Sequence, residues 1–260
     1  MAYSTLHLEA SGDVATITLA RPDKRNAIST EMIGDLMGAL FEVEASSARV
    51  AILTGEGTAF CSGMDLAGLQ ALATQSPLEH LEDSRRLAQL FRRIWSFPKP
   101  TIAAVNGAAI AGGCGIATLC DFTLAVPEAK FGYPEVRIGF IPANVSVFLM
   151  RQIAEKRARD LLLTGRIIDA AEAHRLGLVT QIVPAEELIR TAQALAASLL
   201  ACSPTSLLMT KKLLCDMAAP ELDRELELAV AESTQIRSTA DFREGVASFL
   251  EKRAPRWSGK

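Results

Sequence analysis

The chain has 260 residues, a formal net charge of −3, 49% hydrophobic residues and 22% charged residues. This length and apolar content suit a soluble globular protein with one large α/β unit, or a core with an appendage. The acidic balance argues against broad electrostatic binding of nucleic acid or of an anionic membrane surface. Residues 1–13 contain no basic start and no apolar run, so the sequence predicts no secretory signal and a cytoplasmic location.

The cysteines and histidines favour neither a disulfide framework nor a metal site. The five cysteines are odd in number and form no CxxC pair, and the three histidines show no HExxH spacing. We therefore expect free thiols in a reducing compartment and no metal.

The chain opens with a predicted hairpin and a capped helix. Residues 3–10 and 13–20 alternate apolar and polar side chains around a Ser-Gly-Asp turn, which is typical of an antiparallel hairpin. Ser29 or Thr30 can then cap a helix. The apolar stripe of that helix consists of Ile33, Leu36, Met37, Leu40 and Phe41.

A buried strand, a glycine-punctuated loop and a second capped helix follow. Residues 50–54 predict the strand and residues 55–66 the loop. Ser76-Pro77-Leu78-Glu79 is a capping box with proline at the first helical position, and its helix is expected to end near Trp95.

Residues 99–121 form the central segment of the chain. No side chain between Lys99 and Asp121 is charged, and four glycines lie in the run: Gly107, Gly112, Gly113 and Gly115. The pattern predicts a buried strand, a tight turn and a closely packed helix beginning near Gly112, whose free N–H groups could face an anionic oxygen. A transmembrane helix, or glycines that serve packing alone, are the alternatives.

The second half is predicted to be mostly helical. Strands are expected at 122–126 and 178–183, and helices near 185–200, 204–218 and 221–238, followed by a last helix capped by Asp241. Strands that alternate with helices indicate a layered α/β architecture. The helical tail is expected to pack on the core or on another subunit.

Three stretches carry motifs that are more specific than any single glycine pattern: AFCSGMDL at 59–66, IAAVNGAAIAGGCGIATLCD at 102–121 and FGYPEVRIGFIP at 131–142. Together with ARPDKRNAIS at 20–29 and LTGRIIDAAEAHRLGLVTQIVP at 163–184, they resemble the enoyl-CoA hydratase/isomerase, or crotonase, family along nearly the whole chain.

The resemblance implies an α/β fold in which ββα units wind as a spiral over residues 1–195, with a helical trimerisation region over residues 196–260. It also implies an acyl-CoA thioester as substrate, so that coenzyme A arrives with the substrate and no separate cofactor is needed. Homotrimers or homohexamers are the expected assemblies, and neither a membrane nor a nucleic acid is an expected partner.

By the same resemblance, the backbone N–H groups of Met64 and Gly112 hold the thioester carbonyl. Proton removal α to a thioester, or water addition to its conjugated double bond, places negative charge on that oxygen. Two fixed donors oppose the charge, and the loss of one such donor typically costs roughly 3 kcal/mol of transition-state stabilisation. The Met64 side chain itself need only pack.

Hydratases of this family use two glutamates, and this chain matches only one of them. Glu135 occupies the second position, in FGYPE, while Gly115 stands at the first and would line the substrate site. Two carboxylates can divide the proton transfers of hydration, whereas one suits an isomerase that moves a proton between carbons. The alternative to a catalytic role is that Glu135 is an ordinary solvated acid in a loop.

The sequence that flanks Gly115 and Glu135 resembles that of hydratases, including the methylglutaconyl-CoA type. An isomerase is the alternative. A non-catalytic acyl-CoA-binding or RNA-binding protein of the same fold is a further alternative. Tyr133 and Asn144 are candidates to hold a water or a polar acyl group, although each could equally be a turn or cap residue.

Binding of coenzyme A is expected at the first loop, residues 21–26, which follows the predicted hairpin. Lys24 and Arg25 can bind the phosphates, and Ala27, directly after this loop, is a further candidate. An ordinary exposed loop without a ligand is an equally good interpretation of these residues. Backbone atoms near Ser62, Asp65 and Leu66 are expected to contact adenine and pantetheine. Phe249 and Lys252 match positions through which a neighbouring subunit touches the nucleotide in this family.

Overall fold

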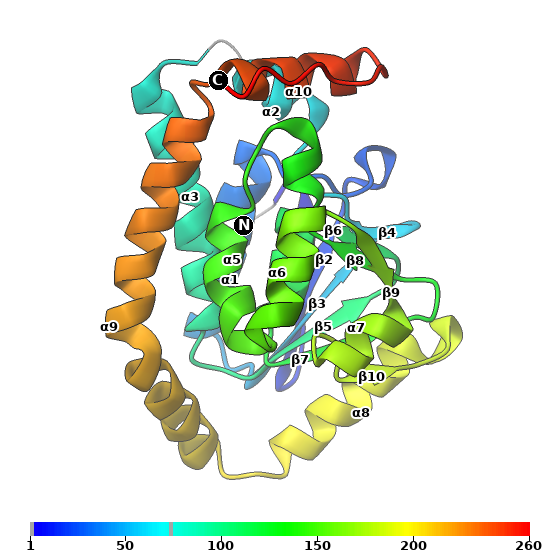
Figure 1. Cartoon of the computed structure of the whole chain (residues 1–260). Coiled ribbons are helices and arrows are strands. Elements are labelled where there is room, and N and C mark those ends of the chain that lie inside the picture. The colour runs from blue at the N-terminus through cyan, green and yellow to red at the C-terminus, as the bar shows by residue number, and fades with distance from the viewer. Residues whose placement is uncertain (1–2, 73–74) are drawn as a thin grey trace.

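A six-stranded sheet forms the centre of the computed structural model, which describes residues 3–72 and 75–260 (Figure 1). Its order is β1-β2-β3-β5-β7-β10, and every neighbouring pair is parallel except the β1–β2 hairpin. The strands are Leu6–Ser11, Val14–Leu19, Val50–Gly55, Thr101–Val105, Phe122–Ala125 and Gln181–Ile182. All five residues of β5 are buried, as expected for a parallel strand covered on both faces.

A second sheet of four short strands, in the order β4-β6-β8-β9, lies next to the first. Its strands are Ala59–Cys61, Ala108–Ile110, Lys130–Gly132 and Ile167–Asp169. The successive pairs β3–β4, β5–β6 and β7–β8 each add one strand to each sheet, so the chain winds between the sheets. The predicted spiral of ββα units is thereby confirmed.

The two predicted helix starts in the first half are confirmed. Helix α1, Thr30–Ala45, is capped by Ser29, whose hydroxyl accepts a hydrogen bond from the Met32 N–H. Helix α3, Pro77–Trp95, carries the complete capping box. One member of the predicted apolar stripe of α1 is wrong. Phe41 is 55% exposed and does not belong to the core; its ring centre instead lies 4.5 Å from the Arg93 guanidinium.

The central segment forms β5, β6 and the short helix α4, Gly112–Thr118, which rules out a continuous membrane helix there. A Cβ on Gly107 would lie 2.1 Å from the Thr58 carbonyl oxygen, so this close turn between β5 and β6 requires glycine. Among the helices within 3–72 and 75–260, none alone has the length and apolar content of a membrane span. Only the bent pair Ala185–Leu200 and Pro204–Ile236 meets that criterion jointly.

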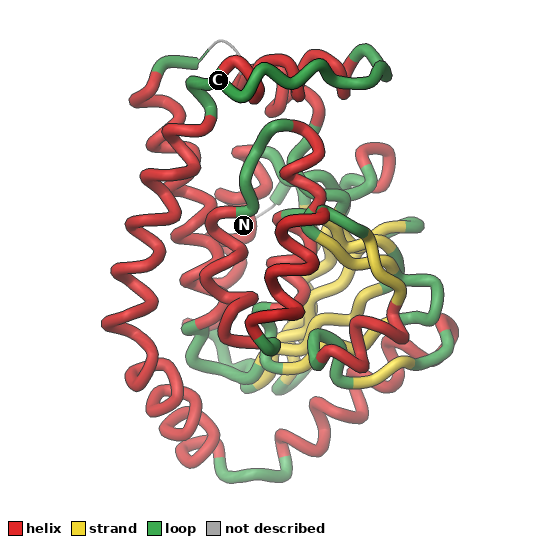
Figure 2. The backbone as a smooth tube through the Cα atoms, in the orientation of Figure 1, coloured by secondary structure: helices red, strands yellow, loops and turns green. Residues whose placement is uncertain are grey.

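The C-terminal half is helical, as predicted (Figure 2). Between the sheets and the tail lie α5, α6, α7 and α8, which span Ala143–Gln152, Glu155–Thr164, Ala170–Leu176 and Leu188–Leu200. Strand β10 covers only the middle of the predicted 178–183 strand. The predicted boundary at residues 195 and 196 falls inside α8.

The predicted break between 218 and 221 is wrong, because one helix, α9, runs over Pro204–Ile236 with Pro220 inside it. A proline removes one N–H and crowds the preceding turn, which bends a helix more readily than it ends one that is packed on neighbours. Here α9 packs along α3 and α5 (Figure 1). Its second half buries the predicted face, namely Leu222, Leu226, Ala229 and Val230.

The cap of the last helix, α10 (Ala240–Leu250), was also predicted wrongly. Thr239, not Asp241, is the N-cap and accepts from the Phe242 N–H. Asp241 lies in the first turn, where its carboxylate accepts from the N–H groups of Ser258 and Gly259 and ties down the C-terminus. Helix α10 packs over α2, Leu66–Leu72, in a small apolar cluster that includes Met64 and Phe140.

Candidate active site

The Met64 N–H points away from the bridge that Met64 forms with Ile28. Ile28 donates its N–H to the Gly63 carbonyl at 2.7 Å, and the Asp65 N–H donates to the Ile28 carbonyl at 3.0 Å. In a parallel bridge these two bonds lie on one side of the segment, so the N–H between them faces the other side. The Met64 N–H therefore stays available to a ligand.

The Gly112 N–H is held in place by an unusual backbone conformation. Gly112 is the first residue of α4, so its N–H has no partner within the helix. Ala111 before it has φ 53° and ψ −125°, a conformation that alanine rarely adopts, and its own N–H donates to the Gly132 carbonyl at 2.8 Å. Such strain persists only where the surroundings impose it.

The two glycine loops are packed directly against each other. A Cβ on Gly113 would lie 2.3 Å from the Cys61 carbonyl oxygen, and one on Gly63 would lie 3.1 Å from the Ala111 Cβ. Ile28, which bridges to Met64, also comes within 3.0 Å of the Cβ position of Gly112. Ile28 therefore contacts both the Met64 segment, through its backbone, and Gly112, through its side chain.

Glu135 is a buried carboxylic acid that forms no ion pair with a residue in the described part of the chain. It lies in the 3-10 helix Pro134–Ile138, after β8, and is 8% exposed. No described residue forms a hydrogen bond with its Oε2 atom. Burial raises the pKa of Glu135 to about 7, and a hydrogen bond from its own backbone N–H opposes the rise. A carboxyl with such a pKa exchanges protons readily near neutral pH.

The burial of Glu135 predicts a pH-dependent stability. The folded state keeps the Glu135 proton up to about pH 7, whereas the unfolded state loses it near the ordinary pKa of 4.5. The unfolded state therefore binds fewer protons between these values, and the free energy of unfolding falls as pH rises through that window. We expect this group to remove about 3 kcal/mol of stability. Urea unfolding of wild type and Glu135→Gln at several pH values should show the decline in wild type alone; parallel curves would contradict it.

Gly115 is covered by apolar side chains. A Cβ there would lie 2.8 Å from Val145 Cγ1 and 3.2 Å from Phe91 Cζ. The ring of Phe91 also comes within 3.6 Å of the Cβ position of Gly112. At the position where the resemblance implies a first glutamate, this chain has a glycine that faces an apolar wall.

The two residues predicted to hold a polar group are both buried. Tyr133 is 1% exposed, and burial raises the pKa of its hydroxyl well above the usual value. Asn144, in the first turn of α5, donates from Nδ2 to the Ser84 carbonyl at 3.2 Å, and none of the described residues pairs with its Oδ1. Ser84 was not singled out from the sequence, because a lone serine within a helix gives no signal.

The predicted coenzyme A segments meet at the first loop. The Ser62 N–H donates to the Arg25 carbonyl at 3.1 Å, while Arg21 pairs with Asp65 at 3.1 Å and also donates to the carbonyl of the buried Ala27. Arg25 adopts a left-handed conformation that ends the 3-10 helix Pro22–Lys24. Lys24 and Arg25 are exposed, and Leu66 begins α2 directly after Asp65. Nucleotide binding by these residues stays a prediction.

Phe249 and Lys252 lie at the far end of the chain from this loop. Phe249, near the end of α10, is 49% exposed, and Lys252 follows the helix with φ 55°. Within the described part of one chain, no hydrogen bond or ion pair joins them to residues 24–27.

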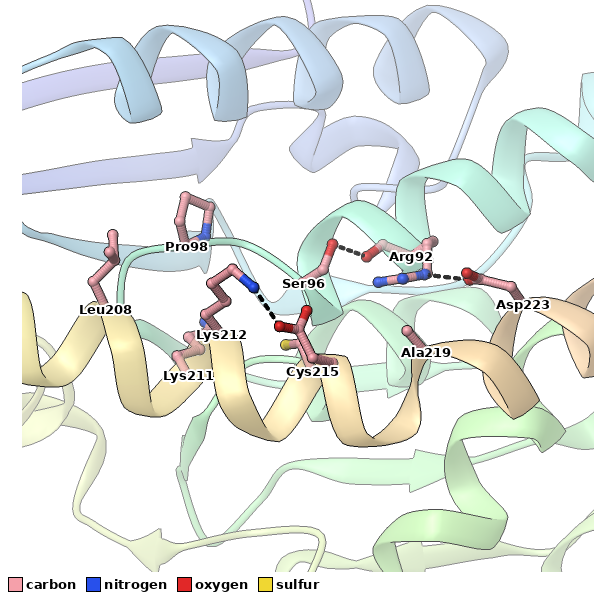
Figure 3. Close-up of a pocket in the computed structure, with 10 residues that line it drawn as sticks. Arg92, Ser96, Pro98, Leu208, Lys211, Lys212, Cys215, Ala219 and Asp223 are labelled. Atoms are coloured by element: carbon pink, nitrogen blue, oxygen red, sulfur yellow. Dashed lines mark hydrogen bonds and ion pairs between the residues drawn. The ribbon is translucent and has the colours of Figure 1, made fainter.

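A cavity of about 540 Å³ lies elsewhere, between α3 and the first half of α9 (Figure 3). Four of its charged side chains form two pairs: Arg92 with Asp223 at 2.7 Å, and Lys212 with Asp216. A fifth, Lys211, pairs with Asp121 outside the lining. None of the predicted site residues lines it, so it is separate from Glu135. No group of three or more metal-ligating side chains occurs within the described ranges.

Comparison with known proteins identifies the same family that the sequence motifs resemble. Residues 9–260 match the family model described as enoyl-CoA hydratase/isomerase. A Thermus thermophilus protein assigned as an enoyl-CoA hydratase is 44% identical over 95% of this chain and 98% of its own length. The crotonyl-CoA hydratase of Syntrophomonas wolfei is 34% identical over the full length of both chains. The crystal structure of an enoyl-CoA hydratase from Mycobacterium avium superposes with a TM-score of 0.87 at 31% identity, covering 98% of this chain and 99% of the other.

Proposed function

Because the chain belongs to the enoyl-CoA hydratase/isomerase family, we propose that it is an enoyl-CoA hydratase, which adds water reversibly to an α,β-unsaturated acyl-CoA. The observation that carries the proposal is the buried carboxyl of Glu135, whose Oε2 pairs with no described residue, together with the backbone N–H donors of Met64 and Gly112. Relatives with the hydratase name that match the full length of the chain support it.

In the proposed reaction, the N–H groups of Met64 and Gly112 donate to the thioester carbonyl oxygen. Addition of a water oxygen to the β-carbon moves electrons toward that carbonyl and creates an enolate-like transition state. Preorganised backbone donors stabilise the developing charge without side-chain reorganisation. The strained Ala111 conformation keeps the Gly112 donor in position.

Glu135 carries the proton in this proposal. Its carboxylate accepts a proton from the attacking water, and the resulting carboxylic acid delivers a proton to the α-carbon, so the acid is regenerated as carboxylate after each turnover. A pKa of about 7 lets the group act in both directions near neutral pH.

Isomerisation of a β,γ double bond to the α,β position is the second candidate, favoured by one specific observation. Phe91 and Val145 cover Gly115, so no carboxylate stands at this position, and one carboxylate suffices to move a proton between two carbons. The finer assignment to the methylglutaconyl type stays a prediction.

For coenzyme A we propose that Lys24 and Arg25 contact the phosphates, and that the substrate brings the only cofactor-like group. We also propose a homotrimer or homohexamer in the cytoplasm. The first half of α9 supports self-association because it exposes apolar side chains: Leu208, Met209, Leu213, Leu214 and Met217.

The two reactions are separated by incubating the protein with an α,β-enoyl-CoA and, in parallel, with its β,γ isomer. We expect the first to gain the mass of one water. Conversion of the second without a mass change, with the first left unhydrated, would favour the isomerase instead. Binding of both without conversion would contradict an enzymatic role.

A further inference from the structure

Two buried polar side chains at the contact of α3 and α5 have unused hydrogen-bonding capacity. Ser84 is fully buried and Asn144 is 6% exposed. In the described part of the chain, nothing pairs with Ser84 Oγ or with Asn144 Oδ1. A buried polar group left unpaired costs about 1–3 kcal/mol, so natural proteins leave such groups where a ligand or a water completes them.

The orientation of the Asn144 amide is determined by its neighbour. Its Nδ2 donates to the Ser84 carbonyl at 3.2 Å, and exchange of the amide atoms would place Oδ1 against that carbonyl. The open atom is therefore an acceptor, Oδ1. The Ser84 hydroxyl beside it can donate or accept. The pair consequently demands a group that can donate a hydrogen bond.

The pair lies on the same helix face as the wall of the thioester site. Ser84, Ala88 and Phe91 follow one another at spacings of four and three residues, which places them on one side of α3. Phe91 reaches the Cβ position of Gly112, and Val145, next to Asn144, reaches that of Gly115. Ala88 between them presents only a methyl group.

Ser84 is separated along α3 from Phe91, the residue whose ring comes close to Gly112. Seven residues of α-helix span about 10 Å. Since an extended chain advances at most about 3.5 Å for every three bonds, this distance corresponds to roughly nine bonds of an acyl chain. The pair is therefore placed for the far end of a medium-length acyl group, not for the water that attacks near the thioester.

We propose that Ser84 and Asn144 form the polar end of the acyl site and select enoyl-CoA substrates that carry a hydroxyl group roughly nine bonds from the thioester carbonyl carbon. This inference rests on the proposed function. A terminal carboxylate can only accept hydrogen bonds, so it would face the Asn144 Oδ1 unfavourably. A terminal methyl group would leave both polar groups unpaired, which a site built for a hydroxyl disfavours.

The test compares unsubstituted, ω-hydroxylated and ω-carboxylated forms of 2-octenoyl-CoA and 2-decenoyl-CoA as substrates of the wild-type protein. Of the two hydroxylated substrates, we expect the one with the higher kcat/KM to exceed the unsubstituted and carboxylated forms of the same chain length by at least about tenfold. In Ser84→Ala and Asn144→Leu, this ratio should fall toward one. Ser146→Ala, on the same helix as Asn144 but with its hydroxyl bonded to the Ala143 carbonyl, should keep the wild-type ratio.

A purely structural role would leave the substrate ratio unchanged in both variants, and that result would overturn the inference. Ser84→Ala removes an unpaired hydroxyl, so its thermal unfolding should match or exceed wild type; this keeps the ratio interpretable if Asn144→Leu folds poorly. Turnover of all six substrates without preference would overturn the inference alone. Turnover of none would overturn the proposed function itself.

Discussion

Glu135→Gln is expected to lower kcat by about 100- to 10,000-fold while acyl-CoA affinity stays close to wild type. The amide keeps the size of the side chain but can neither accept the water proton nor deliver one to the α-carbon. Because the carboxyl is buried and its Oε2 pairs with no described residue, the substitution breaks no ion pair among the described residues. Steady-state kinetics, together with binding of a saturated acyl-CoA measured by calorimetry, checks both halves of this expectation.

A matched control is Glu128→Gln, which makes the same chemical change at an exposed position just before β8. It should leave kcat and KM at wild-type values. If Glu135→Gln hydrated substrate as fast as Glu128→Gln, the acid–base role of Glu135 would be wrong.

Gly113→Ala is expected to reduce both stability and activity strongly. The new methyl group would lie 2.3 Å from the Cys61 carbonyl oxygen, which is backbone and cannot rotate away. The two glycine loops would have to separate, at a cost of about 3 kcal/mol in the free energy of unfolding. A displacement of about 1 Å between the Met64 and Gly112 donors should lower kcat/KM by about 100-fold.

Gly34→Ala gives the comparison for this variant. A Cβ at Gly34, inside α1, meets no atom within 4 Å, so alanine should stabilise the helix by about 0.5–1 kcal/mol and leave activity unchanged. Urea unfolding and initial rates on both variants provide the measurement. Wild-type kinetics in Gly113→Ala would show that the packing of the two loops does not position the donors.

Features with a local chemical signal could be predicted from the sequence. The caps at Ser29 and Ser76 depend on residues within one helical turn, and the strand, turn and helix around Gly112 depend on an uninterrupted apolar pattern. The motif at Glu135 is equally local. These predictions did not require knowledge of what lies far away in the chain.

Features that depend on distant contacts could not be predicted in this way. The strands of the second sheet have three residues each, too few to show a period, and form only because β3, β5 and β7 bring them side by side. The apolar cover of Gly115 comes from Phe91 and Val145, on two other helices. The open hydrogen-bonding atoms of Ser84 and Asn144 likewise exist only where α3 meets α5.

The most direct measurement is hydration of an α,β-enoyl-CoA in water labelled with a heavy oxygen isotope, analysed by mass spectrometry for wild type and Glu135→Gln. Wild type should yield a hydroxyacyl-CoA that carries one labelled oxygen, and Glu135→Gln should yield almost none in the same time. Unlabelled, unhydrated substrate after prolonged incubation with wild type, or equal labelling by both proteins, would contradict hydration at Glu135.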